Sequence, residues 1–186
     1  MSEQQLELFN PTAGFFQKEA LPLPSETRSN PYNEIAIDED TEQAIIDLAL
    51  ETLRLRMKEV NHFFTNPEDT RSYLRLKLSE KEREEFWVLF LNNQHGLIHE
   101  ECLSFGTIDA ATIHPREVVK AALRCNAAAT VLVHNHPSGK SEPSGSDKRI
   151  TERLVKGLSM VDVRVLDHLV VGSTDISSFA ELGLMP

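Results

Sequence analysis

The chain has 186 residues, 40% of them hydrophobic, and its 29 acidic side chains outnumber 19 basic ones to give a formal charge of −10. A chain of this length needs no disulfide or structural metal to fold, and its acidic balance excludes a uniformly basic nucleic-acid coat protein. The sequence contains no apolar run of about 18 residues, so it predicts no membrane span, and the N-terminus lacks the pattern of a secretory signal. With two isolated cysteines, Cys102 and Cys125, these features favour a cytoplasmic protein of one domain with an arm.

Residues 1–40 are expected to form a flexible N-terminal arm. Four prolines interrupt any regular pattern there, at positions 11, 22, 24 and 31. Within the arm, Gln5–Phe9 (QLELF) clusters three apolar side chains. This pentapeptide could dock on the chain's own domain or in the groove of a partner.

Residues 41–79 are expected to form a helical segment. Asp38 to Thr41 supply the acids of a first turn, and Gln43 is placed to complete a capping box. Apolar residues then recur every three or four positions, which predicts one helix that ends near 61–66, with this face: Ile46, Leu50, Leu53, Met57, Val60 and Phe64. Docking of this face on the chain's own core is favoured over homodimerisation. A second short helix is predicted from Pro67 to about Leu78.

Residues 80–186 alternate strand and helix patterns and predict an α/β domain. Strands are expected at 86–91, 97–105, 129–134, 161–165 and 169–171. Helices are expected at 114–126 and 147–158.

The segment with the clearest chemistry begins at the end of the strand predicted at 129–134. His134 and His136 are two residues apart, so a strand would place both imidazoles on one side. Asp147 follows after a loop rich in proline and glycine, at the start of the next predicted helix. Two imidazoles and a carboxylate suit Zn²⁺, and three protein ligands leave a fourth position for water.

Each residue of this group also has an ordinary interpretation. His134 could be a histidine satisfied at a strand end, and Asp147 could be a plain N-cap. Pro137 and Gly139 could be turn formers only. The joint spacing H-x-H, seven residues, Ser, two residues, Asp is far more restrictive than any one of its parts.

The sequence HNHPSG…PSGSD resembles the metal motif of the JAB/MPN+ (JAMM) metalloproteases, and its surroundings resemble their RadC-like branch. The resemblance covers about residues 41–186 and rests on further segments, at 105–108, 114–118, 126–129 and 165–172. It implies a JAMM/MPN-like mixed sheet flanked by helices. Because no helix-hairpin-helix region is recognisable, we expect a short member of the kind associated with prophages or plasmids.

The resemblance also implies roles for individual residues. His134, His136 and Asp147 would hold Zn²⁺, and Ser144 would donate a hydrogen bond to the oxyanion of a tetrahedral intermediate. A glutamate would take the proton of the attacking water, and an E-x-F spacing selects Glu84 for this role.

Other glutamates remain open as that base. Glu85 is the main alternative, and Glu100 and Glu101 on the following strand are further ones. Glu84 could also be a solvated member of the charged run SEKEREE. Near the end of the chain, His168 could orient the site, although a buried histidine between strands is the more ordinary interpretation.

Basic residues concentrate in the second half of the chain, where 110–164 carries nine bases against five acids. Two predicted helix faces are basic: Arg116, Lys120 and Arg124, and Arg149, Arg153 and Lys156. Such faces could bind DNA or simply be solvated. No aromatic residues interleave with them, so stacking on single-stranded bases is not supported.

The favoured function is a zinc metallohydrolase that cleaves a peptide, isopeptide or other amide-linked substrate. The alternative is a DNA-repair or mobile-element accessory protein that binds DNA or the replication machinery. Gln5–Phe9 resembles the QLxLF peptide with which bacterial replication and repair proteins bind the sliding clamp. A scaffold without catalysis is disfavoured because His134, His136, Ser144 and Asp147 are all present.

Overall fold

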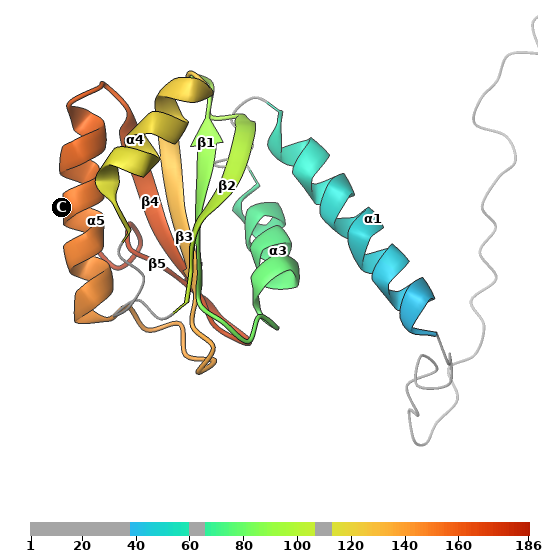
Figure 1. The fold of residues 1–186 in the computed structure, drawn as a ribbon. Coiled ribbons are helices and arrows are strands. Elements are labelled where there is room, and N and C mark those ends of the chain that lie inside the picture. Colours follow the sequence, from blue (N-terminus) through green and yellow to red (C-terminus); the bar gives the residue numbers. More distant parts are fainter. Residues whose placement is uncertain (1–37, 60–65, 107–112) are drawn as a thin grey trace, which may run out of the picture. The chain divides into compact units, whose positions relative to one another are not determined.

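A five-stranded mixed β-sheet lies between two layers of helices (Figure 1). The structure is a computed structural model, and it describes residues 38–59, 66–106 and 113–186. In chain order its elements are α1 (Glu39–Met57), α3 (Pro67–Leu78), β1 (Glu85–Leu91), β2 (Leu97–Phe105), α4 (Pro115–Arg124), β3 (Ala129–Asn135), α5 (Gly145–Ser159), β4 (Arg164–Val171) and β5 (Ile176–Ser178). The α/β fold predicted from the sequence is therefore confirmed.

The strand order is β2-β1-β3-β4-β5. Only β3 and β4 run parallel, joined by α5, and the other neighbouring pairs are antiparallel. Every residue of β3 is buried, as expected for a central strand with helices on both of its faces. The carboxyl ends of β3 and β4 and the amino end of β1 consequently meet at one edge of the sheet.

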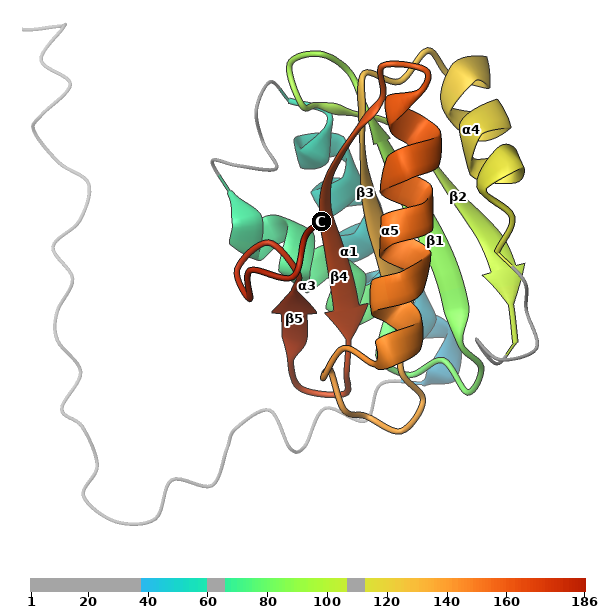
Figure 2. The same ribbon diagram turned by 90° about the vertical axis from the view of Figure 1, so that its left-hand side faces the viewer.

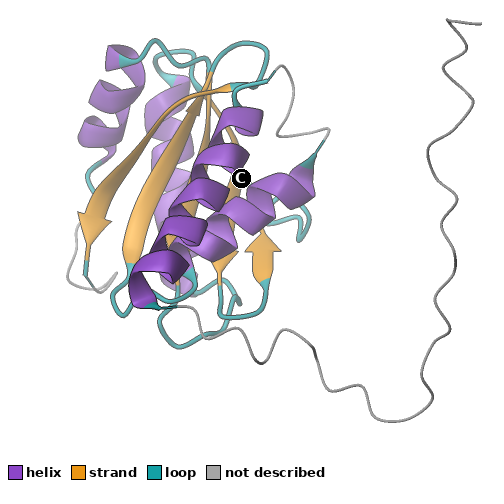
Figure 3. Cartoon of the chain, turned by 90° about the vertical axis from the view of Figure 1, so that its right-hand side faces the viewer, coloured by secondary structure: helices purple, strands orange, loops and turns teal. Residues whose placement is uncertain are grey.

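Each face of the sheet has its own hydrophobic core. On one face α4 and α5 pack on the strands (Figure 2), and on the other α1 and α3 do so (Figure 3). Alternate strand residues divide between the two cores, so that Phe86 and Val88 of β1 face α4 and α5 while Leu89 and Leu91 face α3.

Helix α1 begins as predicted but differs from the expectation in two details. The Asp38 side chain accepts a hydrogen bond from the Thr41 backbone N–H. The predicted capping box with Gln43 is wrong, because Gln43 lies beyond the N3 position and donates to Asp47 instead. The helix ends at Met57, earlier than expected, and the predicted positions Val60 and Phe64 lie outside the described residues.

Docking of α1 on the chain's own core is confirmed for its C-terminal half. Met57 is buried, and Leu50 and Leu53 pack against the same cluster. Ile45, Leu48 and Leu55 remain exposed. Homodimerisation stays a prediction.

The last strands differ most from the expectation. Residues 161–165 and 169–171 were predicted as two strands, but the structure has one, β4, that starts at Arg164. The polar pair Asp167 and His168 interrupts the apolar pattern in the sequence, yet both side chains are buried and hydrogen-bonded. Strand β5 has three residues, which are too few to show a periodic pattern, so the sequence did not predict it.

Among the described residues, none of the helices has the length and apolar character that crossing a membrane requires.

Candidate metal centre

Three segments far apart in the sequence meet at the sheet edge where β3 ends. His134 is the penultimate residue of β3, His136 directly follows the strand, and Asp147 lies in the first turn of α5. Because β1 is antiparallel to β3 and pairs Phe86 with His134, the residues just before β1 arrive at the same edge. The segments lie at the lower edge of the view in Figure 2.

The side-chain atoms of the two histidines and Asp147 converge. Their separations are 3.0 Å between the two Nε2 atoms, 3.4 Å from His134 Nε2 to Asp147 Oδ1 and 3.5 Å from His136 Nε2 to Asp147 Oδ2. Ligands about 2.0–2.1 Å from a tetrahedral zinc ion are roughly 3.3 Å from one another. The three groups therefore fit a zinc ion between them.

The hydrogen bonds behind His136 and Asp147 leave acceptor atoms aimed at this point. His136 Nδ1 donates to the Lys140 carbonyl oxygen over 2.8 Å, so its Nε2 carries a lone pair in the neutral ring. Asp147 Oδ2 accepts from the Ser144 N–H at 2.6 Å. Asp147 Oδ1 is buried and makes no hydrogen bond, which suits a cation ligand better than a structural carboxylate.

The charge states of His134, His168 and Asp147 agree with a cation site. Burial lowers the pKa of His134 and lowers that of His168, behind it, well below the usual range, so both rings are neutral. Burial opposes ionisation of Asp147, but the nearby imidazoles of His134 and His136 outweigh it and hold the pKa of this carboxyl well below its ordinary value. The nearby Asp147 carboxylate in turn raises the pKa of His136.

Glu84 lies just before β1, and Glu85 is the first residue of that strand. A carboxylate oxygen of Glu84 and a ligand atom of each histidine lie within 4.8 Å of one another. The Asp147 oxygens lie 3.4 and 3.5 Å from the same two imidazoles, so two carboxylates, those of Glu84 and Asp147, lie near the pair of histidines. Glu85 instead accepts a hydrogen bond from Trp87 Nε1.

Asn135, between the two histidines, has a role that the sequence analysis missed. Its buried side chain accepts from the Glu85 backbone N–H at 2.8 Å and donates to the Arg83 carbonyl at 3.0 Å. These two bonds flank Glu84 and fix the backbone that carries it. The sequence held one signal for this role: Asn135 is a polar residue at the end of an apolar strand, and strand alternation directs it away from His134 and His136.

Ser144 caps α5 in a capping box with Asp147. Its exposed hydroxyl accepts from the Asp147 N–H at 3.2 Å. The alternative that Asp147 is a plain N-cap is wrong, because Ser144 holds that position and Asp147 is N3. Since the Ser144 oxygen acts as an acceptor here, its proton can point toward a substrate oxygen, and the role stays a prediction.

The loop between His136 and α5 is held against the turn that follows β4. The Ser173 N–H donates to the Gly139 carbonyl, and the His136 N–H donates to the Val171 carbonyl. Gly139 has φ +79°, and a Cβ on Gly172 would lie 2.6 Å from the Gly139 carbonyl oxygen. Both positions therefore need glycine, and the ligand loop is tied to the sheet.

The other candidate bases lie elsewhere. Glu100 forms an ion pair with Lys77 and accepts from the Tyr73 hydroxyl on the α3 face. Glu101 pairs with Arg124. Neither belongs to the group that contains Glu84, and the segment Gln5–Phe9 lies outside the described residues.

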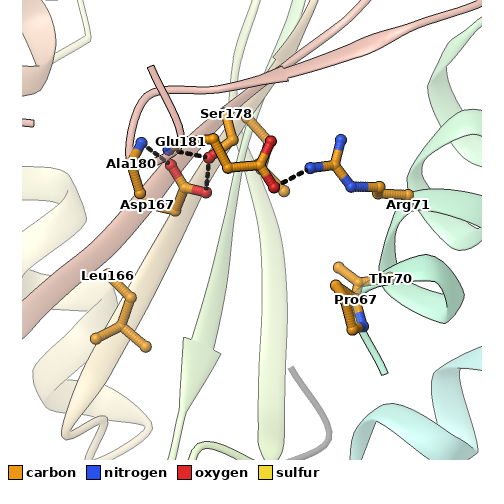
Figure 4. A pocket seen from close by; sticks show the side chains of 9 residues that line it. Pro67, Thr70, Arg71, Leu166, Asp167, Ser178, Ala180 and Glu181 are labelled. Carbon is orange, nitrogen blue, oxygen red and sulfur yellow. Dashed lines mark hydrogen bonds and ion pairs between the residues drawn. The ribbon is translucent and has the colours of Figure 1, made fainter. Parts of the chain in front are cut away.

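A second polar cluster lies on the opposite face of the sheet, beside a cavity of about 210 Å³ between α3, β4 and the C-terminal turn (Figure 4). Asp167 is buried there and accepts three hydrogen bonds, from Ser178 Oγ and from the backbone N–H groups of Ala180 and His168. Arg71 closes the cluster through an ion pair with Glu181 at 2.6 Å.

Comparison with known proteins identifies the family. The family described as "RadC-like JAB domain" matches residues 64–184. The UPF0758 proteins YeeS and YfjY of Escherichia coli are 52% and 50% identical to the chain over 144 and 145 residues. Each match covers 77–78% of this chain and 97% and 91%, respectively, of the relative.

A UPF0758 protein of Vibrio cholerae is 50% identical over 141 residues. That match covers 76% of this chain and 62% of the relative, so the chain spans under two thirds of the longer Vibrio proteins. The family match covers most of the chain, and relatives about 50% identical are matched over nearly their whole length. This protein therefore belongs to the family of RadC-like JAB domains.

Proposed function

We propose that the chain is a zinc-dependent hydrolase that cleaves amide or isopeptide bonds with a metal-activated water. The observation that carries the proposal is the convergence of two imidazole Nε2 atoms and one buried, ionised carboxylate, separated by 3.0–3.5 Å. Three protein ligands of this kind are typical of catalytic zinc sites, which keep one position open, whereas structural sites usually close with four.

The residues around the ligands suit hydrolysis of an acyl compound. When bound, Zn²⁺ would polarise the scissile carbonyl and bring the pKa of water at the open position to about 7. Glu84, whose carboxylate lies within 4.8 Å of a ligand atom of each histidine, would accept the proton of the attacking water and pass it to the leaving amine. The Ser144 hydroxyl and the positive end of α5 would stabilise the negative charge that develops on the carbonyl oxygen.

The test separates metal binding from proton transfer. Metal-free protein is reconstituted with Zn²⁺, its metal content is measured by mass spectrometry, and hydrolysis is followed on a library of fluorogenic peptide and isopeptide amides. Wild type should bind one Zn²⁺ per chain and cleave part of the library. His136→Ala should lose both properties, whereas Glu84→Gln should keep the metal and lose hydrolysis by a factor of about 100 or more.

Glu85→Gln is the matched control, because Glu85 is adjacent in sequence but faces Trp87. It should retain zinc and activity. Full activity in Glu84→Gln would refute the assignment of the base, and a wild type that binds no Zn²⁺ would refute the proposed function itself.

The alternative, an accessory protein that binds DNA, has less support in the described residues. The basic side chains of α4 are engaged by acids: Glu117 pairs with Arg116 and Lys120, and Glu101 pairs with Arg124. DNA binding through such a surface would weaken steeply as salt rises. A titration at two salt concentrations therefore tests the alternative independently of hydrolysis.

A further inference from the structure

A chain of hydrogen bonds runs through the protein interior from one metal ligand to the backbone of another. His134 Nδ1 lies 2.8 Å from His168 Nε2, and His168 Nδ1 lies 2.6 Å from Thr151 Oγ1. Thr151 Oγ1 in turn lies 2.6 Å from the main-chain oxygen of Asp147. The chain thus crosses from β3 to β4 to α5, and all three of its side chains are fully buried.

The donor and the acceptor of each bond can be worked out from the end of the chain, the carbonyl oxygen of Asp147. A carbonyl oxygen carries no proton, so the Thr151 hydroxyl must donate to Asp147 and can only accept from His168. His168 therefore carries its proton on Nδ1, and its Nε2 is an acceptor. That acceptor faces His134 Nδ1, which must then hold the proton of the His134 ring.

We propose that His168 and Thr151 are positioning residues that fix the Nδ1–H tautomer of His134, so that its Nε2 lone pair is directed at the metal. The inference rests on the proposed function in one respect, because it takes His134 to be a metal ligand. His136 reaches the same tautomer by a shorter route, through its bond to the Lys140 carbonyl. Partners of this kind commonly orient histidine ligands and increase their basicity.

The surroundings of His168 hold its ring in this orientation. Phe179 stacks on it with centroids 4.7 Å apart, and the ring of Phe86 meets it edge-on at 5.6 Å. A histidine that only filled this space could be replaced by an apolar residue at little cost, since burying a polar ring is unfavourable unless its hydrogen bonds are made. At His168 these hydrogen bonds are made, because both ring nitrogens have a partner, His134 at Nε2 and Thr151 at Nδ1.

The first test reads the tautomers directly in the metal-free protein. Long-range ¹H–¹⁵N correlation spectra of ¹⁵N-histidine-labelled protein distinguish a ring protonated at Nδ1 from one protonated at Nε2. Wild type should show His134 and His168 both protonated at Nδ1. In Thr151→Val the acceptor of His168 is lost, so the Nε2–H form of His134 should become populated, and Thr151→Ser should restore the wild-type spectrum. Protonation of His134 at Nε2 in wild type would overturn the proposal.

The second test sets zinc affinity against stability. His168→Leu keeps the volume and removes the acceptor, whereas His168→Gln keeps an acceptor oxygen near the position of Nε2. Competition with a chromophoric chelator should show that His168→Leu binds Zn²⁺ about 10–100-fold more weakly than wild type. His168→Gln should recover most of that loss, although its buried amide makes the metal-free fold less stable than that of His168→Leu.

A purely structural His168 predicts the reverse order, with affinity following stability. Equal zinc affinity in His168→Leu and wild type would therefore refute the positioning role. The outcome is separable from that of the proposed function. If wild type bound no Zn²⁺, the hydrolase would be refuted, and the tautomer spectra of the metal-free protein would still decide the role of His168.

Discussion

Two buried aspartates on opposite faces of the sheet differ in how their oxygens are satisfied. Asp167 receives three hydrogen bonds, one from a hydroxyl and two from backbone N–H groups. Asp147 receives one from the Ser144 N–H, while its other oxygen makes none and faces the imidazole of His134. The first carboxylate has the environment of a structural residue, and the second has that of a ligand.

The comparison shows why burial alone does not identify a functional acid. A buried polar atom without a partner costs stability, so its persistence calls for another explanation. At Asp147 a bound cation would supply that explanation, because the two imidazoles and the carboxylate converge on the same place. At Asp167 nothing comparable is needed, and the carboxylate joins β4 to the turn after β5.

The largest expected effect is on zinc affinity and separates the two carboxylates directly. Asp147→Asn should weaken binding about 100-fold or more, since three ligands share a binding free energy on the order of 10 kcal/mol. Asp167→Asn, the matched control, should bind Zn²⁺ as wild type does. Competition with a chelator measures both, and equal losses in the two variants would break the distinction between them.

The second expected effect concerns the stability of the metal-free protein, and here the Asp167 variant should lose more than the Asp147 variant. Asp167→Ala leaves three donors without their acceptor, two of them on the buried residues His168 and Ser178, and we expect a loss of about 2–3 kcal/mol in the free energy of unfolding. Asp147→Ala removes a capping contact worth about 1 kcal/mol but also an oxygen that lacks a donor. Urea titrations of the metal-free variants measure both. A larger loss for Asp147→Ala would mean that Asp147 is primarily structural.

The sequence predicted the parts of this comparison that depend on short spacing. The H-x-H pair and the aspartate eleven residues after His136 lie within one strand, one loop and one helix turn, so their convergence follows from local structure. Asn135 and Thr151 were not predicted as parts of the site, and His168 was predicted only as a residue that could orient it. Their partners come from other elements, with 50 residues between Asn135 and Glu85 and 34 between His134 and His168, and no local pattern shows such contacts.

The fold was predictable for a similar reason. Continuous apolar runs predicted β1 and β3 nearly to the residue, the turn after β1 predicted β2, and capping residues predicted α3. Strand β4 was divided in two because Asp167 and His168, both buried, resemble a break in an apolar run. A buried polar pair can belong to a strand only when distant groups satisfy it, which in this chain are Ser178, Thr151 and His134.

A smaller effect is expected at Asn135, which links the ligand strand to the segment that carries Glu84. Asn135→Ala removes the acceptor of the Glu85 N–H, so exchange of that amide with solvent should accelerate by about tenfold, the equivalent of one hydrogen bond. Zinc binding should persist because both imidazoles keep their own partners. Hydrogen-exchange mass spectrometry of segment 81–86 tests this, with Asn93→Ala in the exposed β1–β2 turn as control. Unchanged exchange would show that Asn135 does not hold this segment.

The smallest expected effect concerns the pKa of Asp167, which burial and its three hydrogen-bond donors shift in opposite directions. Burial raises the pKa of Asp167 above its ordinary value of 3.8, although the bonds from Ser178, Ala180 and His168 oppose the shift. A group with a raised pKa in the folded state stabilises the fold below its ordinary pKa, and that contribution is lost as pH rises through the folded value. The free energy of unfolding of wild type, minus that of Asp167→Asn, should therefore fall as pH rises above about 4 and then level off.

Taking the difference between the two proteins removes the titration of the groups they share. Each unit of pKa shift corresponds to about 1.4 kcal/mol of this fall. Glu181→Gln should make the fall smaller, because the charge of Glu181 contributes to raising the pKa of Asp167. A difference that instead rises with pH would show that three donors outweigh burial, and Asp167 would then be ionised like Asp147. The two aspartates would differ only in what faces them, donors at one and lone pairs at the other.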